Sequence, residues 1–248
     1  MREAPVGWQC KTCVAAARAP TPRRAGRLGA TRITPVVTGL IAVNVAVYLW
    51  EQGNLTQRED RFAMWPIGVY FYHQWYRLVT AAFLHASVEH ILFNMVTLAI
   101  VGPPVEAEIG KGRFFVLYML SALGGSVASY LLSPANEAGI GASGAIFGVM
   151  GAYYVIARRR GWEVRTITAL VAINLLLSLT SPGIDWRAHL GGLLIGVAAC
   201  AGLLAAPRGV SATRASPVVQ VVQTAAVTIA VLMVLGALVQ LPPGHVNL

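Results

Sequence analysis

The chain consists largely of long apolar runs separated by short segments that carry arginine, proline and glycine. Seven runs approach the ~20 apolar residues that a helix needs to cross a bilayer: 35–50, 88–105, 114–132, 142–157, 167–179, 188–206 and 218–241. Only 12% of the residues are charged and 56% are hydrophobic, whereas a soluble domain has about 25% charged residues. Because backbone polar groups need partners inside lipid, this pattern predicts an all-α protein that crosses a membrane several times.

The basic residues indicate how these runs are oriented. The net charge is +9, and the basic side chains form short clusters between the apolar runs. This placement fits membrane topology and argues against a surface for nucleic acid. Clusters precede the first run, as at Arg23-Arg24, and follow the fourth, at Arg158-Arg159-Arg160. The positive-inside rule therefore predicts a cytoplasmic N-terminus and an extracytoplasmic C-terminus.

In this topology the second, fourth and sixth runs all pass from outside to inside, and polar residues lie near their starts. His90 is in the first turn of the second run, Ser143 in that of the fourth and His189 in that of the sixth. Asn94 follows His90 by four residues, on the same helix face and about 6 Å deeper. Polar side chains are costly inside a membrane, so these four are candidate functional residues near the outer surface.

Glycines recur at helical spacing in the fourth and sixth runs: Gly144, Gly148, Gly151, Gly192 and Gly196. Small residues three or four positions apart let membrane helices approach closely, and packing is their common role. Close approach would also bring Ser143 to hydrogen-bond distance of His189.

A serine beside a histidine is typical of covalent hydrolysis. A neutral imidazole can take the serine proton, so we interpret Ser143 as the nucleophile and His189 as the base. Attack on a peptide carbonyl creates an oxyanion that needs hydrogen-bond donors. His90, Asn94 and the Ser143 N–H are candidate donors, and Gly141 leaves room for a substrate backbone beside Ser143. The residues thus predict peptide hydrolysis within the membrane.

Five short motifs follow in order: Trp75-Tyr76-Arg77, His85…His90-x-x-x-Asn94, Gly102-x-x-x-Glu106-x-x-x-Gly110, Gly141-Ala142-Ser143-Gly144 and Ala188-His189-x-x-Gly192. Together they resemble the motifs of the rhomboid intramembrane serine proteases, over residues 33–241. The resemblance implies a compact six-helix core with Ser143 at the floor of a water-filled cavity open to the outside. It also implies a Ser143–His189 dyad without an acid, an oxyanion hole of His90 and Asn94, and no cofactor. The seventh run is similar to the extra C-terminal helix of bacterial six-plus-one members.

Two features depart from the family pattern or interrupt it. Phe147, one turn after Ser143, stands where the family often has a tyrosine that stacks on the histidine. Phenylalanine can stack but has no hydroxyl, so the orientation of the histidine would depend on other groups. Pro103-Pro104 interrupts the end of the second run, and we expect it to break the helix just before Glu106.

Three charged residues are expected to be structural. Arg77 and Glu106 match family positions that hold the scaffold, so we expect them to tie loops to helix ends. Asp185 lies one turn before His189 and is tempting as a third member of a triad. We interpret it as a cap of the sixth helix instead.

The chain is expected to have three parts. Residues 1–32 form a basic cytoplasmic leader, 33–206 the catalytic core, and 207–248 a linker, the seventh helix and a short tail. Within the leader, Cys10-x-x-Cys13 resembles the end of a zinc-ribbon prefix found on some bacterial members. A structural zinc needs four ligands and no second Cys or His pair lies nearby, so a half zinc site and a bare leader both stay open.

The resulting hypothesis is a multi-pass serine endopeptidase of the bacterial cytoplasmic membrane. It would cut peptide bonds in or next to transmembrane helices of other membrane proteins, at small residues near helix-breaking ones. Substrates would enter from the bilayer between the second and fifth spans. The alternative is a catalytically silent rhomboid-like protein that binds client transmembrane segments. Nothing in the sequence indicates the natural substrate or the oligomeric state.

Overall fold

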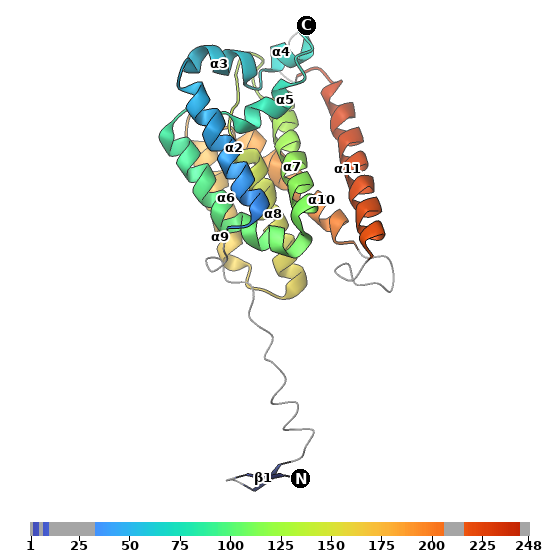
Figure 1. Ribbon diagram of the computed structural model, residues 1–248. Helices are drawn as coiled ribbons and strands as arrows, with labels where there is room; N and C mark the ends of the chain where they lie inside the picture. The colour runs from blue at the N-terminus through green and yellow to red at the C-terminus, as the bar shows by residue number, and fades with distance from the viewer. Residues whose placement is uncertain (1, 5–6, 10–32, 206–215, 244–248) are drawn as a thin grey trace.

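The computed structural model describes residues 2–4, 7–9, 33–205 and 216–243. Helices make up nearly all of it (Figure 1), and one short antiparallel hairpin pairs β1, Arg2–Ala4, with β2, Gly7–Gln9. The hairpin was not predicted from the sequence. Cys10 and Cys13, the possible half zinc site, lie outside the described residues.

Each predicted apolar run corresponds to one long helix, and the ends differ by a few residues: α2 Pro35–Glu51, α6 Val88–Ile109, α7 Lys111–Leu132, α8 Ser143–Arg160, α9 Arg165–Thr180, α10 Trp186–Leu203 and α11 Pro217–Val239. Of the described helices, α6, α7, α10 and α11 are long and apolar enough to cross a membrane, while α2 and α9 are shorter apolar helices. The α8 helix lies inside the bundle and ends in three arginines. The predicted all-α, multi-pass fold class is confirmed.

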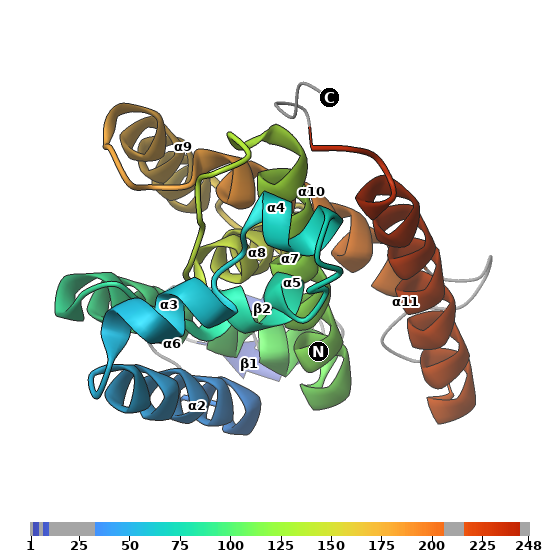
Figure 2. The same ribbon diagram turned by 90° about the horizontal axis from the view of Figure 1, so that it is seen from above.

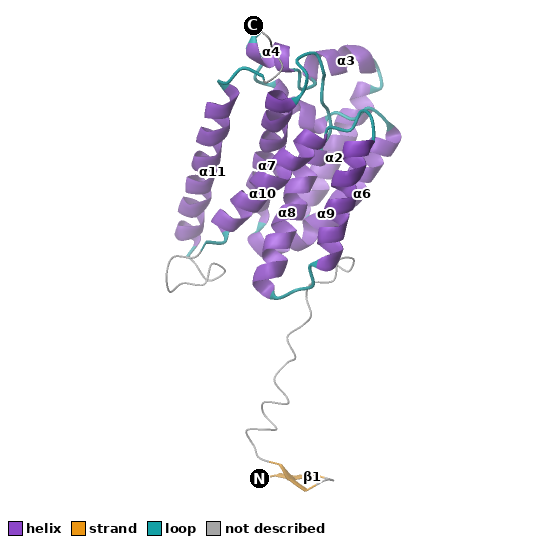
Figure 3. Ribbon diagram, turned by 180° about the vertical axis from the view of Figure 1, so that it is seen from behind, coloured by secondary structure: helices purple, strands orange, loops and turns teal. Residues whose placement is uncertain are grey.

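The α8 helix is the centre of the bundle (Figure 2). Helices α7 and α10 pack against it and against each other, and α6 packs on a further side and is covered by α2. Two helices, α9 and α11, lie at the edge of the bundle, and α11 packs beside α7 and α10 (Figure 3). Among its described residues α9 buries only Ile167 and Ser178, and α11 buries only Leu235 and Val239. Their outward faces are apolar, so they face lipid.

Four short helices cover one end of the bundle, the upper end in Figure 1: α3 Leu55–Phe62, α4 Pro66–Tyr70, α5 Arg77–Thr80 and the 3₁₀ helix η1 Ala81–Phe83. The buried guanidinium of Arg77 holds this segment together. It donates to the carbonyl oxygens of Ala63 at 2.7 Å and Asp60 at 2.8 Å. The sequence predicts that Arg77 ties loops to helix ends, and these contacts agree with that prediction.

Helices α8 and α10 touch through their backbones. A Cβ added to Gly192 would lie 1.9 Å from the carbonyl oxygen of Gly144, and one added to Gly196 would lie 2.3 Å from Cα of Gly148. Glycine is therefore required at both levels. The expected packing role of these glycines is confirmed, and it sets the distance between the two helices that carry Ser143 and His189.

Pro103 and Pro104 do not break α6, which continues to Ile109, so that prediction was wrong. Each proline removes one backbone donor, but packing and hydrogen bonds hold the turn beyond them. The Glu106 carboxylate is buried there and accepts from the backbone N–H groups of Val36 at 3.2 Å and Val37 at 3.0 Å. It thereby caps the start of α2, and tertiary contacts outweigh the local preference of proline.

Candidate active site

Ser143 and His189 meet at one end of the bundle. Ser143 is the first residue of α8, and His189 lies in the first turn of α10. The imidazole Nε2 is 2.7 Å from Ser143 Oγ. The glycine contact between Gly144 and Gly192 lies directly beside this pair and holds the two helix starts together. A hydroxyl and an imidazole at this distance can exchange a proton.

The ring of His189 is held on its face and at its second nitrogen. Phe147 stacks on it, with ring centroids 4.3 Å apart and planes 15° from parallel. The imidazole Nδ1 lies 2.6 Å from Ser178 Oγ, which belongs to α9. The sequence did not predict this role of Ser178, because the contact depends on how α9 docks beside α10 and no motif marks it.

Asp185 caps α10, as predicted. Its carboxylate accepts from the backbone N–H groups of Arg187 and Ala188, each at 3.1 Å, and from the hydroxyl of Ser129. Within the described part of the chain, the hydrogen bonds of this carboxylate do not include the His189 ring. Asp185 therefore acts as a helix cap and not as the third member of a triad.

A cavity of about 450 Å³ brings the predicted residues of the site together. Its lining includes His90, Asn94, Ser143, Phe147 and His189. The lining continues between α6 and α9 to Phe93 and Leu177, which are exposed on the outside of the bundle. Arg77 and Glu106 do not line this cavity, in keeping with their structural contacts.

The turn before Ser143 requires a glycine. Gly141 has φ +127°, and a Cβ there would lie 2.7 Å from Nε2 of His90. The Gly141 N–H donates to the Ala81 carbonyl at 2.8 Å, and Gly139 pairs with Met64 through two backbone hydrogen bonds. These bonds fix the turn beside the imidazole of His90, at the start of α8.

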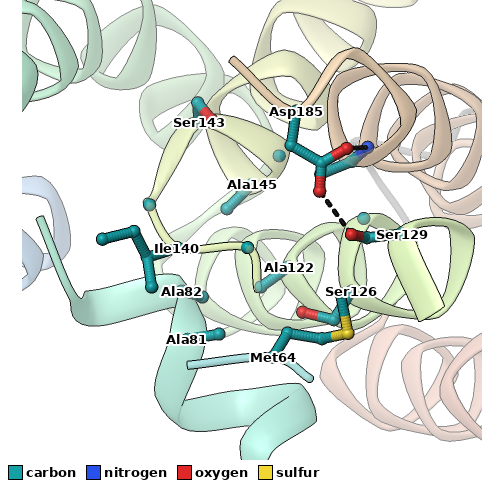
Figure 4. A pocket seen from close by; sticks show the side chains of 15 residues that line it. Met64, Ala81, Ala82, Ala122, Ser126, Ser129, Ile140, Ser143, Ala145 and Asp185 are labelled. Atoms are coloured by element: carbon teal, nitrogen blue, oxygen red, sulfur yellow. Dashed lines mark hydrogen bonds between the residues drawn. The ribbon is translucent and has the colours of Figure 1, made fainter. Parts of the chain in front are cut away.

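A second, much smaller cavity lies on the other side of this turn, with room of about 20 Å³ (Figure 4). Small side chains and the cap of α10 line it, among them Ala81, Ala122, Ser126, Ala145 and Asp185. Ser143 lines both cavities. The space is enough for one water-sized group. Among the described residues, no group of three His, Cys, Asp or Glu side chains is arranged to hold a metal ion.

Comparisons with known proteins agree on one family. The family model of the rhomboid domain matches residues 72–206. The chain is 32% identical over 170 residues to the putative rhomboid protease YdcA of Bacillus subtilis, and the match covers 65% of this chain and 85% of YdcA. It is 41% identical over 135 residues to the rhomboid protease GluP of the same species, 52% of this chain but only 26% of GluP.

The rhomboid protease AarA of Providencia stuartii is more distant but matches over more of the chain. It is 28% identical over 204 residues, which are 68% of this chain and 71% of AarA. Three bacterial relatives named as rhomboid proteases therefore agree with the family model and with the bundle of apolar helices. The chain belongs to the rhomboid family of intramembrane proteases.

Proposed function

We propose that the chain is a serine endopeptidase that cuts membrane-protein substrates in or next to their transmembrane helices. The observation that carries the proposal is the 2.7 Å contact between Ser143 Oγ and His189 Nε2 at a cavity between helices. His189 takes the Ser143 proton as the oxygen attacks the peptide carbonyl, then returns it to the leaving amine. Water, activated by the same imidazole, hydrolyses the acyl-enzyme and regenerates Ser143.

The oxyanion of this reaction has suitable donors nearby. Asn94 Nδ2 is buried and has no hydrogen-bond partner among the described residues, and its side chain lines the cavity with Ser143. A buried donor without a partner is uncommon in proteins, and this one is free to donate a hydrogen bond to an anionic oxygen. His90 lines the same cavity. We assign Asn94, His90 and the Ser143 N–H, at the positive end of α8, to the oxyanion.

The two cavities support a route by which the substrate enters and a preference for a small side chain beside the cut bond. The larger one reaches the lipid-facing surface between α6 and α9, and α9 is loosely packed, so a transmembrane segment can enter there. The smaller one, at Ser143, has room only for a small side chain on the substrate beside the cut bond. A helical substrate must unwind to expose its carbonyl, which favours segments that contain glycine or proline.

The direction of the helices supports the orientation that we propose. The helix α8 runs from Ser143 to the arginines at 158–160, and Glu108 near the end of α6 pairs with Arg160. Because the neighbouring Glu106 contacts the start of α2, that start lies at the same arginine-bearing end. The positive-inside rule then places residues 1–32 in the cytoplasm and the active site near the outer surface. We assign 33–206 as the catalytic core and 207–248 as the linker, seventh helix and tail, in a bacterial cytoplasmic membrane.

The test uses the full chain in proteoliposomes with a single-span substrate that carries a Gly-Ala pair in its span. The parent should cleave it and bind a fluorophosphonate probe, whereas Ser143→Ala and His189→Asn should do neither. Ser121→Ala is the matched control, because it removes a buried serine hydroxyl that bonds only within α7. Cleavage by Ser143→Ala at the parent rate would refute the proposal. A parent that cross-links to the substrate but neither cleaves nor labels would favour the silent binder.

A further inference from the structure

A chain of three short hydrogen bonds runs through the ring of His189. The hydroxyl of Ser178 lies 2.6 Å from the backbone carbonyl oxygen of Asn174 and 2.6 Å from His189 Nδ1. On the far side of the ring, Nε2 lies 2.7 Å from Ser143 Oγ. Ser178 and His189 are 3% and 6% exposed, so both side chains are almost completely buried.

The number of protons fixes the direction of every bond in this chain. A carbonyl oxygen can only accept, so the single hydroxyl proton of Ser178 lies between its Oγ and the Asn174 carbonyl. Ser178 Oγ therefore has only lone pairs to offer His189, and Nδ1 must carry a proton and donate it. In a neutral imidazole only one nitrogen is protonated. Nε2 is then unprotonated and accepts from the Ser143 hydroxyl.

We propose that Ser178 is a positioning residue that holds His189 in the tautomer needed for proteolysis. The inference rests on the proposed function and extends it, since only the tautomer with a free Nε2 can take the Ser143 proton. Ser178 itself gives up no proton during the reaction. When Nε2 gains the Ser143 proton, Nδ1 keeps its own and still donates to Ser178.

The stacked ring of Phe147 does not do the same work. Stacking fixes the plane of the imidazole but leaves its two nitrogens equivalent, because a half-turn of the ring preserves the stack. Ser178 Oγ, on α9, distinguishes the two nitrogens because it accepts a hydrogen bond from Nδ1. The other nitrogen, Nε2, then faces the hydroxyl of Ser143 on α8. Ser178 is also one of only two described residues that α9 buries. The group that sets the tautomer thus comes from the helix that borders the substrate route.

Activity measurements come first, on the full chain in proteoliposomes. Ser178→Ala removes the acceptor, and we expect kcat to fall about tenfold to a hundredfold with KM changed less than about twofold, the range found for hydrogen-bond partners that orient metal-binding histidines. Ser178→Thr keeps a hydroxyl at Oγ1 and should recover most of the rate. Ser121→Ala is the matched control, since its hydroxyl also bonds a buried carbonyl one turn back, at 2.8 Å, but touches no histidine. It should keep the parent rate.

A second measurement reads the tautomer without proteolysis. The chain has five histidines, so ¹⁵N-histidine labelling with His189→Asn as the assignment standard isolates the two ring nitrogens of His189. In the parent and Ser178→Thr, Nδ1 should give the signal of a protonated nitrogen and Nε2 that of an unprotonated one. Ser178→Ala should mix the two forms.

The outcomes separate the two ideas. A parent that cleaves, with Ser178→Ala equally fast or with an unchanged His189 signal, overturns the role of Ser178 and leaves the protease intact. A parent with Nε2 protonated also overturns it. A parent that neither cleaves nor labels, whatever the His189 signal, refutes the proposed function instead. Loss of rate in Ser178→Ala, recovery in Ser178→Thr and the change of tautomer together support the inference.

Discussion

Gly192→Ala tests whether the backbone contact between α8 and α10 sets the catalytic geometry. The added Cβ would lie 1.9 Å from the Gly144 carbonyl oxygen, whereas real Cβ contacts stay above 3.0 Å. The helices must therefore separate by about 1.1 Å, which overpacking data equate with a loss of about 1–3 kcal/mol of stability. Gly192 is three residues from His189 and Gly144 follows Ser143, so the change opens the dyad itself.

The effect on the rate follows from the dyad distance. A separation of that size stretches the 2.7 Å contact between Ser143 and His189 to about 3.8 Å, beyond hydrogen-bond range. Misplacement by about 1 Å costs roughly a hundredfold in rate. Gly196→Ala acts one turn deeper, where the closest contact is 2.3 Å, so we expect a smaller loss of activity.

The assay is the initial rate of substrate cleavage in proteoliposomes, with thermal unfolding in detergent as the measure of folding. Gly236→Ala, in α11, is the control, because its Cβ would meet nothing within 4 Å. That variant should keep the parent rate and gain up to about 1 kcal/mol of helix stability. If Gly192→Ala is folded and cleaves within threefold of the parent rate, the backbone contact does not set the dyad geometry.

Two further expectations concern stability. Glu106→Gln should lower the free energy of unfolding by about 1–3 kcal/mol, because one of the two carboxylate oxygens becomes an amide NH2 and a buried N–H group at the start of α2 loses its acceptor. Glu108→Gln, which breaks only a surface ion pair with Arg160, should cost no more than about 1 kcal/mol in the same unfolding assay; equal losses would contradict the cap. Burial, with a smaller effect of His90, lowers the pKa of His85, in the loop before α6, to about 4. The folded state thus favours neutral His85, so this group contributes fully to the free energy of unfolding above pH 6.5. As the pH falls to 4, the unfolded state binds the proton more readily, and the free energy of unfolding should drop by about 3 kcal/mol. Thermal midpoints against pH should fall less steeply in His85→Asn, and parallel curves would refute this origin.

Much of the fold could be predicted because a bilayer leaves few choices. Length and apolarity located every long helix to within a few residues, and charge ordered the runs so that His90, Ser143 and His189 share one depth. The glycine spacing further indicated that Gly144 and Gly192 would meet. These signals are local in sequence, and they determine positions in space because a membrane fixes the direction and depth of each helix.

Other features depend on contacts that no local rule contains. Pro103 and Pro104 carry a strong local preference against helix, but the buried Glu106 and its bonds to α2 override it. The link between Ser178 and His189 depends on the lateral docking of α9. A serine in a membrane helix normally bonds its own carbonyl one turn back, as Ser178 does with Asn174, so its sequence context looks ordinary.

The docking of α9 also explains how the histidine can be oriented without a carboxylate. In water-exposed proteases an aspartate accepts from Nδ1, but a carboxylate within a membrane span is costly to bury. A serine whose proton is already given to a helix carbonyl offers the same acceptor with no charge, and the carbonyl bond fixes which way it points. The one carboxylate near His189 in sequence, Asp185, caps α10 instead, so its charge is balanced by backbone N–H groups at the helix start. Ser178→Asp would therefore bury a charge within a membrane span. We expect its free energy of unfolding to be lower than that of Ser178→Ala, although aspartate is the stronger acceptor.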